Sequence, residues 1–462
     1  MTLPESPQEP KIFQLLQWIL NPTGYMERLA SQYGDIFRMP ALTSNPRKPV
    51  IFVSNPEGLQ HLLSRDRGQD FCAPEDMNEI LRPIVGSQSL LLQSGATHQR
   101  QRKLLMPPFH GDRLKVYGEK ICEISDRVFA ALPLNQMFPM RQAMQDVTLQ
   151  VMMEVVFGLS KGERYDVLKP LLAQFTDFLG SPWRASLLFF GFLQQDWGPW
   201  SPWGRMVSTR QQIDELLYAE IRERRQQDCR DREDILSLMM TARDENGELL
   251  SETEVRDELL TLLLAGHETT ASALAWAFYW IHQNPRIYEK VMAELNELGP
   301  NPDPMSIYKL PYLTAVCNET LRIAPAAMLT FFRHTTRPLE FMGYQLDTDT
   351  PVVGSIYLVH RRPDIYPNPE QFRPERFLER DFSPYEFVPF GAGMRRCIGA
   401  VLAQYEMKLT LATVLSRYSL QLCENRPVKP QRRGITLAPG TGVRMKITEV
   451  TAETGDRATV AV

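Results

Sequence analysis

The chain has 462 residues, a formal net charge of −4, 43% hydrophobic residues and 23% charged residues. This balance is typical of a globular protein and argues against a nucleic-acid partner. Its six cysteines show no paired spacing, which argues against a secreted disulfide framework and favours a reducing compartment. No linker, repeat or composition break divides the chain, so one domain over residues 1–462 is expected, with short tails at about 1–10 and 449–462.

The N-terminus has no basic segment followed by a long apolar stretch, so no signal peptide is expected. Its most apolar piece, residues 12–20, contains Gln14 and Gln17 and is too short to span a bilayer. These features predict a protein without a transmembrane anchor.

Helical periodicity dominates the rest of the chain, and strand-like pieces are few and short. The spacing of apolar residues predicts helices over residues 56–63, 114–132, 141–157, 206–227, 252–284, 286–298, 310–323 and 398–418. Strands are predicted over residues 36–39, 50–53, 330–335, 341–346, 352–357 and 443–447. The expected fold is therefore mainly α with a small β-rich lobe.

The longest helical pattern, residues 254–284, ends before Pro285 and is apolar all round, as a buried helix is. Its middle reads Ala265-Gly-His-Glu-Thr-Thr270, although a glycine costs about 1 kcal/mol in a helix interior and a buried glutamate must be satisfied. A zinc-protease helix is excluded because the residue four positions after His267 is alanine. Two interpretations remain, a functional site and a helix kink with a satisfied polar cluster.

Cys397 lies in Phe390-Gly-Ala-Gly-Met-Arg-Arg-Cys-Ile-Gly399, between an extended run and a helical pattern. The glycines let the backbone approach something large and flat, and Arg395, Arg396 and the helix N-terminus favour a thiolate. A lone thiolate in this frame suits the axial ligand of a haem iron. The alternative is a buried structural cysteine behind a glycine-rich turn.

The cysteine segment matches the pattern Phe-x-x-Gly-x-Arg-x-Cys-x-Gly at every fixed position, and residues 265–270 fit Ala/Gly-Gly-x-Asp/Glu-Thr-Thr/Ser. From about residue 34 to 447 the sequence therefore resembles the cytochrome P450 family of haem-thiolate monooxygenases, and most of all its cyanobacterial and bacterial fatty-acid hydroxylating members. The resemblance implies the cytochrome P450 fold, with haem b (iron protoporphyrin IX) between the long central helix and the cysteine loop. It also implies that Cys397 is the iron ligand, that Glu268 relays protons and that Thr269 assists oxygen activation.

The same resemblance implies a set of residues that hold the haem. His98 and Arg102 match a Trp/His-x-x-x-Arg helix whose two ends contact a propionate, and Arg333 and Arg395 are further cationic candidates, with solvated surface arginines as the alternative. The expected cofactor-binding residues are His98, Arg102, Arg333, Phe390, Gly391, Arg395, Cys397, Ile398 and Gly399. A buried charge network that locks the cysteine loop to the core is expected from Glu319, Arg322 and Arg376.

The expected substrate pocket is apolar, which indicates a lipophilic substrate. Its candidate lining residues are Leu81, Leu91, Ala265, Ala327, Met328 and Leu329. Residues 182–204 hold four of the seven tryptophans and resemble, by position, the mobile region over the family's substrate channel. These aromatics either pack the roof of the pocket or rest on a membrane. Arg47 is either a carboxylate anchor near the channel mouth or a plain surface residue.

These features predict a cytoplasmic, bacterial-type monooxygenase, expected as a monomer, that hydroxylates a fatty acid or, as second choice, a terpenoid or alkane. The length leaves no room for a fused flavin reductase, so a separate ferredoxin and ferredoxin reductase are expected to supply electrons. Arg100, Lys103 and Arg396 would form a basic face for an acidic ferredoxin.

Two alternatives stay open. A haem-thiolate peroxygenase or isomerase needs no external electrons, but its members usually lack the acid–alcohol pair that Glu268 and Thr269 form. A non-enzymatic haem sensor would need an output domain, and no segment resembles one.

Overall fold

The computed structural model describes residues 3–42, 49–73, 81–109, 111, 113–180, 194–195, 198–227, 232–434 and 436–451. Its helices are α1 Lys11–Leu20, α2 Pro22–Tyr33, α3 Pro56–Ser64, α4 Arg82–Val85, α5 Gly95–Leu105, α6 Arg113–Ala130, α7 Met140–Val151, α8 Glu163–Gly180, α10 Pro202–Gln226, α11 Ile235–Thr241, α12 Glu252–Gln283, α13 Pro285–Glu297, α14 Pro304–Tyr308, α15 Pro311–Ile323, α16 Ile356–Val359, α17 Arg376–Glu379 and α18 Ala400–Arg417. Its strands are β1 Ile36–Met39, β2 Val50–Val53, β3 Phe71–Cys72, β4 Met137–Pro139, β5 Arg333–Thr335, β6 Leu339–Phe341, β7 Tyr344–Leu346, β8 Pro351–Gly354, β9 Tyr418–Leu422, β10 Pro430–Arg433, β11 Thr436–Pro439 and β12 Arg444–Val450.

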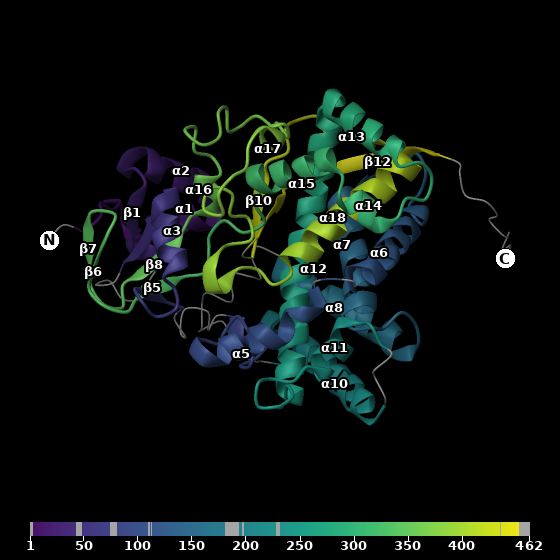
Figure 1. Cartoon of the computed structure of the whole chain (residues 1–462), viewed down its shortest axis with the longest axis horizontal. Helices are drawn as coiled ribbons and strands as arrows, with labels where there is room; N and C mark the ends of the chain where they lie inside the picture. Colours follow the sequence, from purple (N-terminus) through teal and green to yellow (C-terminus); the bar gives the residue numbers. More distant parts are fainter. Residues whose placement is uncertain are drawn as a thin grey trace.

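The strands gather mainly in a lobe beside the helical body (Figure 1). Its main sheet has the order β1-β2-β8-β5-β3, in which β2 and β8 run parallel and the other pairs run antiparallel. A second sheet has the order β4-β12-β9, and β6-β7 and β10-β11 form two-stranded hairpins. The expectation of a mainly helical protein with a small β-rich lobe is confirmed.

All eight predicted helices are present, with ends shifted by a few residues. The strand predicted over residues 341–346 is wrong, because Met342 and Gly343 take positive φ angles of 53° and 81° and turn the chain between β6 and β7. The strand predicted over 352–357 ends early, since the Ser355 side chain accepts the Leu358 N–H and starts α16. Periodicity missed α8, which carries Pro170 in its interior.

Helix α12 crosses the whole helical body (Figure 1). Ser251 and Glu254 form a capping box at its start, and the helix continues without a break through residues 265–270 to Gln283. The irregular turn lies instead at the end of α7, where residues 152–156 are π-helical. Met152 Sδ there lies 3.2 Å from the position that a Cβ on Gly266 would take.

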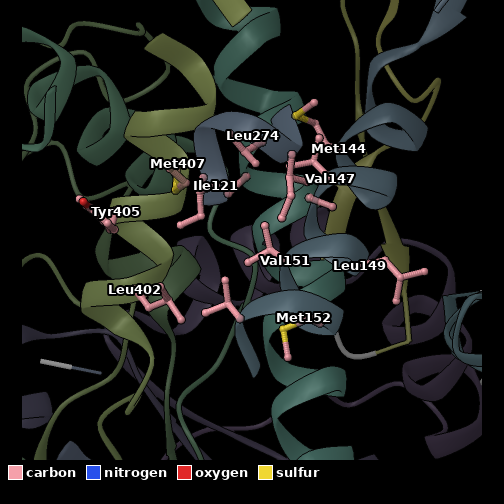
Figure 2. Packing of buried hydrophobic residues seen from close by; sticks show 14 of the residues in the cluster. Ile121, Met144, Val147, Leu149, Val151, Met152, Leu274, Leu402, Tyr405 and Met407 are labelled. Carbon is pink, nitrogen blue, oxygen red and sulfur yellow. The ribbon is translucent and has the colours of Figure 1, made fainter. Parts of the chain in front are cut away.

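The main hydrophobic core lies where α6, α7, α12 and α18 meet. Figure 2 shows Ile121 of α6, Val147 of α7, Leu274 of α12 and Met407 of α18 pointing into one cluster. Each of these side chains is at most 1% exposed. Burial of this kind contributes about 1.5–3 kcal/mol per large side chain, which fixes α12 and α18 relative to each other. These two helices frame the candidate site.

Glu406 of α18 is buried at 5% exposure, and its Oε1 has no hydrogen-bond partner among the described residues. Burial raises the pKa of this carboxyl from 4.5 to about 8. The folded state therefore binds the proton more tightly than the unfolded state, and stability is lost as pH rises from about 4.5 to about 8.

We predict that Glu406→Gln stabilises the holoprotein at pH 8 relative to wild type, and that the difference shrinks by roughly 2–3 kcal/mol at pH 5.5. Unfolding midpoints measured by circular dichroism at both pH values test this. Glu449→Gln, at an exposed position, is the matched control. A pH-independent difference between wild type and Glu406→Gln would contradict the prediction.

Candidate active site

Cys397 lies in the loop that leads into α18. The Cys397 N–H donates to the Phe390 carbonyl at 2.9 Å, which closes the loop, and Gly399 is the N-cap of α18. Gly391 and Gly393 take φ angles of 65° and 69°, which side chains with a Cβ rarely adopt. The predicted tight turn before a helix is confirmed. The extended run predicted over residues 386–390 is wrong, because the Phe387 N–H donates to the Ser383 carbonyl and the Gly391 N–H to the Val388 carbonyl, so the chain turns before the cysteine loop.

The glycines of this loop differ in what surrounds them. A Cβ on Gly399 would meet nothing within 4 Å, and one on Gly391 would meet only the Arg395 carbonyl at 3.9 Å. Gly393 instead packs on protein, since its Cβ would lie 2.1 Å from the Leu63 carbonyl oxygen. The prediction that glycines leave room for a large group therefore fits Gly391 and Gly399, whereas Gly393 serves the contact with α3.

Cys397 is an exposed residue although it lies deep in the protein, so it borders an internal space. Burial raises the pKa of its thiol, while the Gly399 N–H, Arg102 and Arg396 act in the opposite direction. Arg396 and the helix terminus lower the pKa as predicted, but desolvation is the larger effect, so the pKa of the thiol is raised overall. A coordinated metal ion would reverse this balance, since it deprotonates a thiol outright.

Helix α12 is less buried within residues 265–270, the segment that the sequence analysis identified, than on either side of it. Ala265 is exposed, and Gly266, Glu268 and Thr269 are half-buried, although residues 255–263 and 271–279 are buried. Leu264 of α12, Phe390 and Ile398 of the cysteine loop and Leu91 are likewise only partly covered by the main core. We infer that these apolar surfaces face one cavity.

Cationic groups gather near Arg395 of the cysteine loop. Burial first, and then Arg395, Arg102 and Arg333, lower the pKa of His98 to about 3. Burial and the neighbouring charges of Arg333 and Arg102 also lower the pKa of Arg395, to about 10. His98 and Arg395 also line a pocket of about 590 Å³, together with Met394 and the acidic residues Asp66 and Asp349. An anionic group with carboxylates would relieve this repulsion.

Two of the expected propionate partners are already engaged. Arg333 is buried and donates to Asp66 Oδ2 from Nε and Nη2, at 3.1 and 2.7 Å, and from Nη1 to the Phe331 and Phe332 carbonyls. Its contacts therefore favour a structural role over the predicted propionate contact. Arg395 donates from Nη1 to the Leu90 carbonyl and from Nη2 to the Gln93 carbonyl. Neither of these two hydrogen bonds uses its Nε.

The acid–alcohol pair of α12 is oriented by its neighbours. Arg141 of α7 donates to both Glu268 oxygens, at 2.9 and 3.2 Å, and Gln145 donates to Oε2 at 2.9 Å. The Thr269 hydroxyl donates to the Ala265 carbonyl one turn back. Glu268 thus points toward α7, where a polar cavity of about 520 Å³ is lined by Arg141, Gln145, Asp146, Asp177, His267 and Arg433.

The predicted substrate-pocket residues divide by exposure. Ala265 is exposed and Leu91, Ala327 and Leu329 are half-buried, so these four can border the cavity. Leu81 is buried in the main core at 6% exposure, and Met328 packs at 4% exposure in a cluster with Trp18 and Phe52. Arg47, Trp183 and Trp197 lie outside the described residues, Trp200 is 92% exposed and Trp203 is buried.

The predicted basic face for a ferredoxin is partly wrong. Arg100 donates to Asp244 at 2.6 Å and to Glu254 at 2.9 Å, and the pKa of its guanidinium is raised by these partners. Lys103 pairs with Glu245 at 2.6 Å, but both side chains are mostly exposed, so this pair is weak. Arg396 is exposed beside Cys397.

Sequence patterns gave no signal for several residues that hold the site. Asp66 accepts the Met394 N–H of the cysteine loop at 3.1 Å, and His360 accepts the Val388 N–H at 2.9 Å. Arg141 is the partner of Glu268. All three contacts join elements far apart in the sequence, where no short motif could have found them.

Comparison with known proteins gives the class of this site. The family model Cytochrome P450 matches residues 4–443. Cytochrome P450 135B1 of Mycobacterium tuberculosis is 31% identical over 450 residues, covering 97% of this chain and 92% of its own length. Cytochrome P450 137 of the same organism is 35% identical over 437 residues, covering 91% and 84%. The solved structure of cyanobacterial CYP120A1 with retinoic acid bound superimposes with a TM-score of 0.84 at 26% identity, covering 97% of this chain and 99% of the other.

The chain belongs to the cytochrome P450 family, whose members are haem-thiolate monooxygenases. Haem b is the family's cofactor, and the residues present fit it. The open space at Gly391 and Gly399 would take a flat ring, the cluster around His98 and Arg102 would take its carboxylates, and Cys397 would supply a sulfur ligand. In the described part of the chain, no helix is long and apolar enough to cross a membrane.

We predict that Cys397→Ser abolishes the strongly red-shifted Soret band that a thiolate-ligated, reduced haem gives with carbon monoxide. Absorbance spectra of purified protein test this, with haem content measured separately. Cys423→Ser, in a half-buried position away from the loop, should keep the band. Retention of the band in Cys397→Ser would overturn the assignment of this residue.

Proposed function

We propose that this protein hydroxylates a lipophilic carboxylic acid with dioxygen, with electrons from a ferredoxin and a ferredoxin reductase. The observation that carries the proposal is the uncovered stretch of α12 at residues 265–269, beside apolar side chains of the cysteine loop. Haem, when bound, supplies the activation of dioxygen. The residues of this chain bind the substrate, exclude water and move protons.

An apolar substrate is supported by the residues that can border the cavity, Leu91, Leu264, Ala265, Ala327 and Leu329. A medium- or long-chain fatty acid is the first candidate. The structure of CYP120A1 with retinoic acid bound favours a terpenoid acid as the second. Both share a long apolar body and one carboxylate, so the apolar wall serves either.

Protons are proposed to reach the site through Glu268. Its carboxylate lies between α12 and α7, and its partners Arg141 and Gln145 line the polar cavity of about 520 Å³. Water in that cavity can exchange a proton with Glu268, and rotation of the side chain away from Arg141 carries the proton toward Thr269. The Thr269 hydroxyl, free to leave the Ala265 carbonyl, completes the relay.

Electron transfer is proposed on the cysteine side, at Arg396 and Lys103. Arg396 is exposed beside Cys397, and Lys103 lies on α5 with an exposed, weakly paired ammonium. Two exposed cations would steer an acidic ferredoxin, with rates that fall as salt rises.

We predict that Thr269→Ala uncouples the reaction, lowering hydroxylated product per NADPH by at least about tenfold while hydrogen peroxide increases. Proton delivery fails when the hydroxyl is missing, although electrons still arrive. Thr269→Ser keeps a hydroxyl and should stay coupled. An unchanged ratio in Thr269→Ala, or full activity with peroxide alone in wild type, would favour a peroxygenase over this proposal.

We predict that medium- and long-chain fatty acids displace water from the iron and shift the Soret band to the blue in titrations of the oxidised protein. The matching methyl esters should bind more weakly if the carboxylate is recognised. Retinoic acid, terpenes and steroids form the comparison panel. A shift with neutral terpenes or steroids, and none with any carboxylic acid, would remove the acid from the proposal and keep the monooxygenase.

A further inference from the structure

Helix α1 shows an apolar face to solvent. Ile12, Phe13, Leu16 and Leu20 are 72%, 45%, 49% and 74% exposed, and they recur at the spacing of one helix face. Lys11 is the only charged residue of this helix. We call these four side chains the α1 stripe.

The orientation of α1 is fixed by its inner face. The buried Gln14 amide donates to the Glu9 carbonyl at 2.8 Å, and the buried Trp18 ring packs edge-on against Phe52 at 6.0 Å. A helix that faced water would expose its glutamine and bury its leucines. The arrangement is inverted here, since Gln14 is buried and the α1 stripe is exposed.

We propose that the α1 stripe docks on the surface of a phospholipid membrane, with the helix lying in the interface. Amphipathic helices bind in this way through buried apolar area, without crossing the bilayer. Residues 3–33 carry Glu5, Glu9, Lys11, Glu27 and Arg28, a sum of −1, so the attachment is hydrophobic and needs no anionic lipid.

A second copy of the chain fits this face less well. Ten helical residues extend about 15 Å, and four side chains offer far less than the roughly 800 Å² per partner of a stable interface. A lipid surface has no such minimum, because it receives each apolar side chain independently.

The α1 stripe also lies near the proposed substrate site. Arg432 of the β10-β11 hairpin donates to the Trp18 carbonyl at 3.3 Å, and its guanidinium lies 5.9 Å from the Trp18 ring centroid. On the other strand of the hairpin, Thr436 pairs with Ala327. One hairpin therefore lies between α1 and Ala327, a residue of the proposed substrate pocket. Only this statement about the pocket rests on the proposed function.

The test is flotation of the haem-loaded protein with phosphatidylcholine vesicles. Wild type should float, and the triple variant Ile12→Ser/Leu16→Ser/Leu20→Ser should lose at least about tenfold in vesicle partitioning. The control variant Leu134→Ser/Leu249→Ser/Leu378→Ser changes three exposed leucines elsewhere and should float like wild type. Haem content and carbon-monoxide spectra verify that all three proteins are folded.

Four outcomes would overturn the proposal. Wild type could stay with the soluble fraction, or the triple variant could float equally. Flotation could require anionic lipid and vanish at high salt, which would indicate a charged surface instead. Light scattering could show a lipid-free dimer that the triple variant dissociates, which would assign the α1 stripe to a second copy. None of these results depends on which substrate the enzyme hydroxylates.

Discussion

The Glu319 carboxylate, 0% exposed inside α15, holds the cysteine side of the structure together. It accepts from Arg322 Nε at 2.6 Å, from Arg376 Nε at 3.1 Å and from the Arg373 N–H at 2.8 Å. Arg322 in turn donates to the His360 carbonyl, and His360 accepts the Val388 N–H just before the cysteine loop. Removing Glu319 would leave two guanidiniums buried without a counter-charge, a loss of about 3–5 kcal/mol or more. Glu319 therefore supports the backbone just before the cysteine loop through Arg322 and His360.

Asp66, which follows α3 in the β-rich lobe, makes the second contact that holds the cysteine loop. Its carboxylate accepts from Arg333 of β5 and from the Met394 N–H, and all of these groups lie beside Gly393. A Cβ on Gly393 would come within 2.7 Å of Asp66 Oδ2, so only glycine allows this contact. Met394 is thus held by Asp66, and Val388 by His360, which Arg322 of α15 links to Glu319, so two separate contacts fix the backbone before Cys397.

The sequence predicted whatever depends on local pattern or on a short motif. The eight periodic helices, the Glu319–Arg322–Arg376 network and the turn at Cys397 belong to this class. Sequence reasoning failed where burial or a residue distant in the sequence determines the property of a side chain. Examples are the pKa of the Cys397 thiol, the pairing of Arg100 with Asp244 and the orientation of Glu268 by Arg141. Helix α1 escaped prediction for a further reason. Its apolar residues face outward, so its pattern does not describe packing against a core.

One face of α12 combines support and access. Glu258, Thr261, Ala265 and Thr269 follow one another at intervals of three or four residues, so they lie on one stripe of the helix. Glu258 accepts the Leu90 N–H at 2.7 Å, and Thr261 shares a hydrogen bond with Ser89 at 2.6 Å.

Residues 89–93 form the segment that contacts this stripe of α12. Arg395 of the cysteine loop donates hydrogen bonds to two carbonyls of the same segment, those of Leu90 and Gln93. Burial raises the pKa of Glu258 well above its usual range, since a neutral acid costs less to bury than a carboxylate. The segment therefore binds α12 through its N–H groups and the cysteine loop through its carbonyls. The contacts of this segment with α12 end before Ala265, which is exposed.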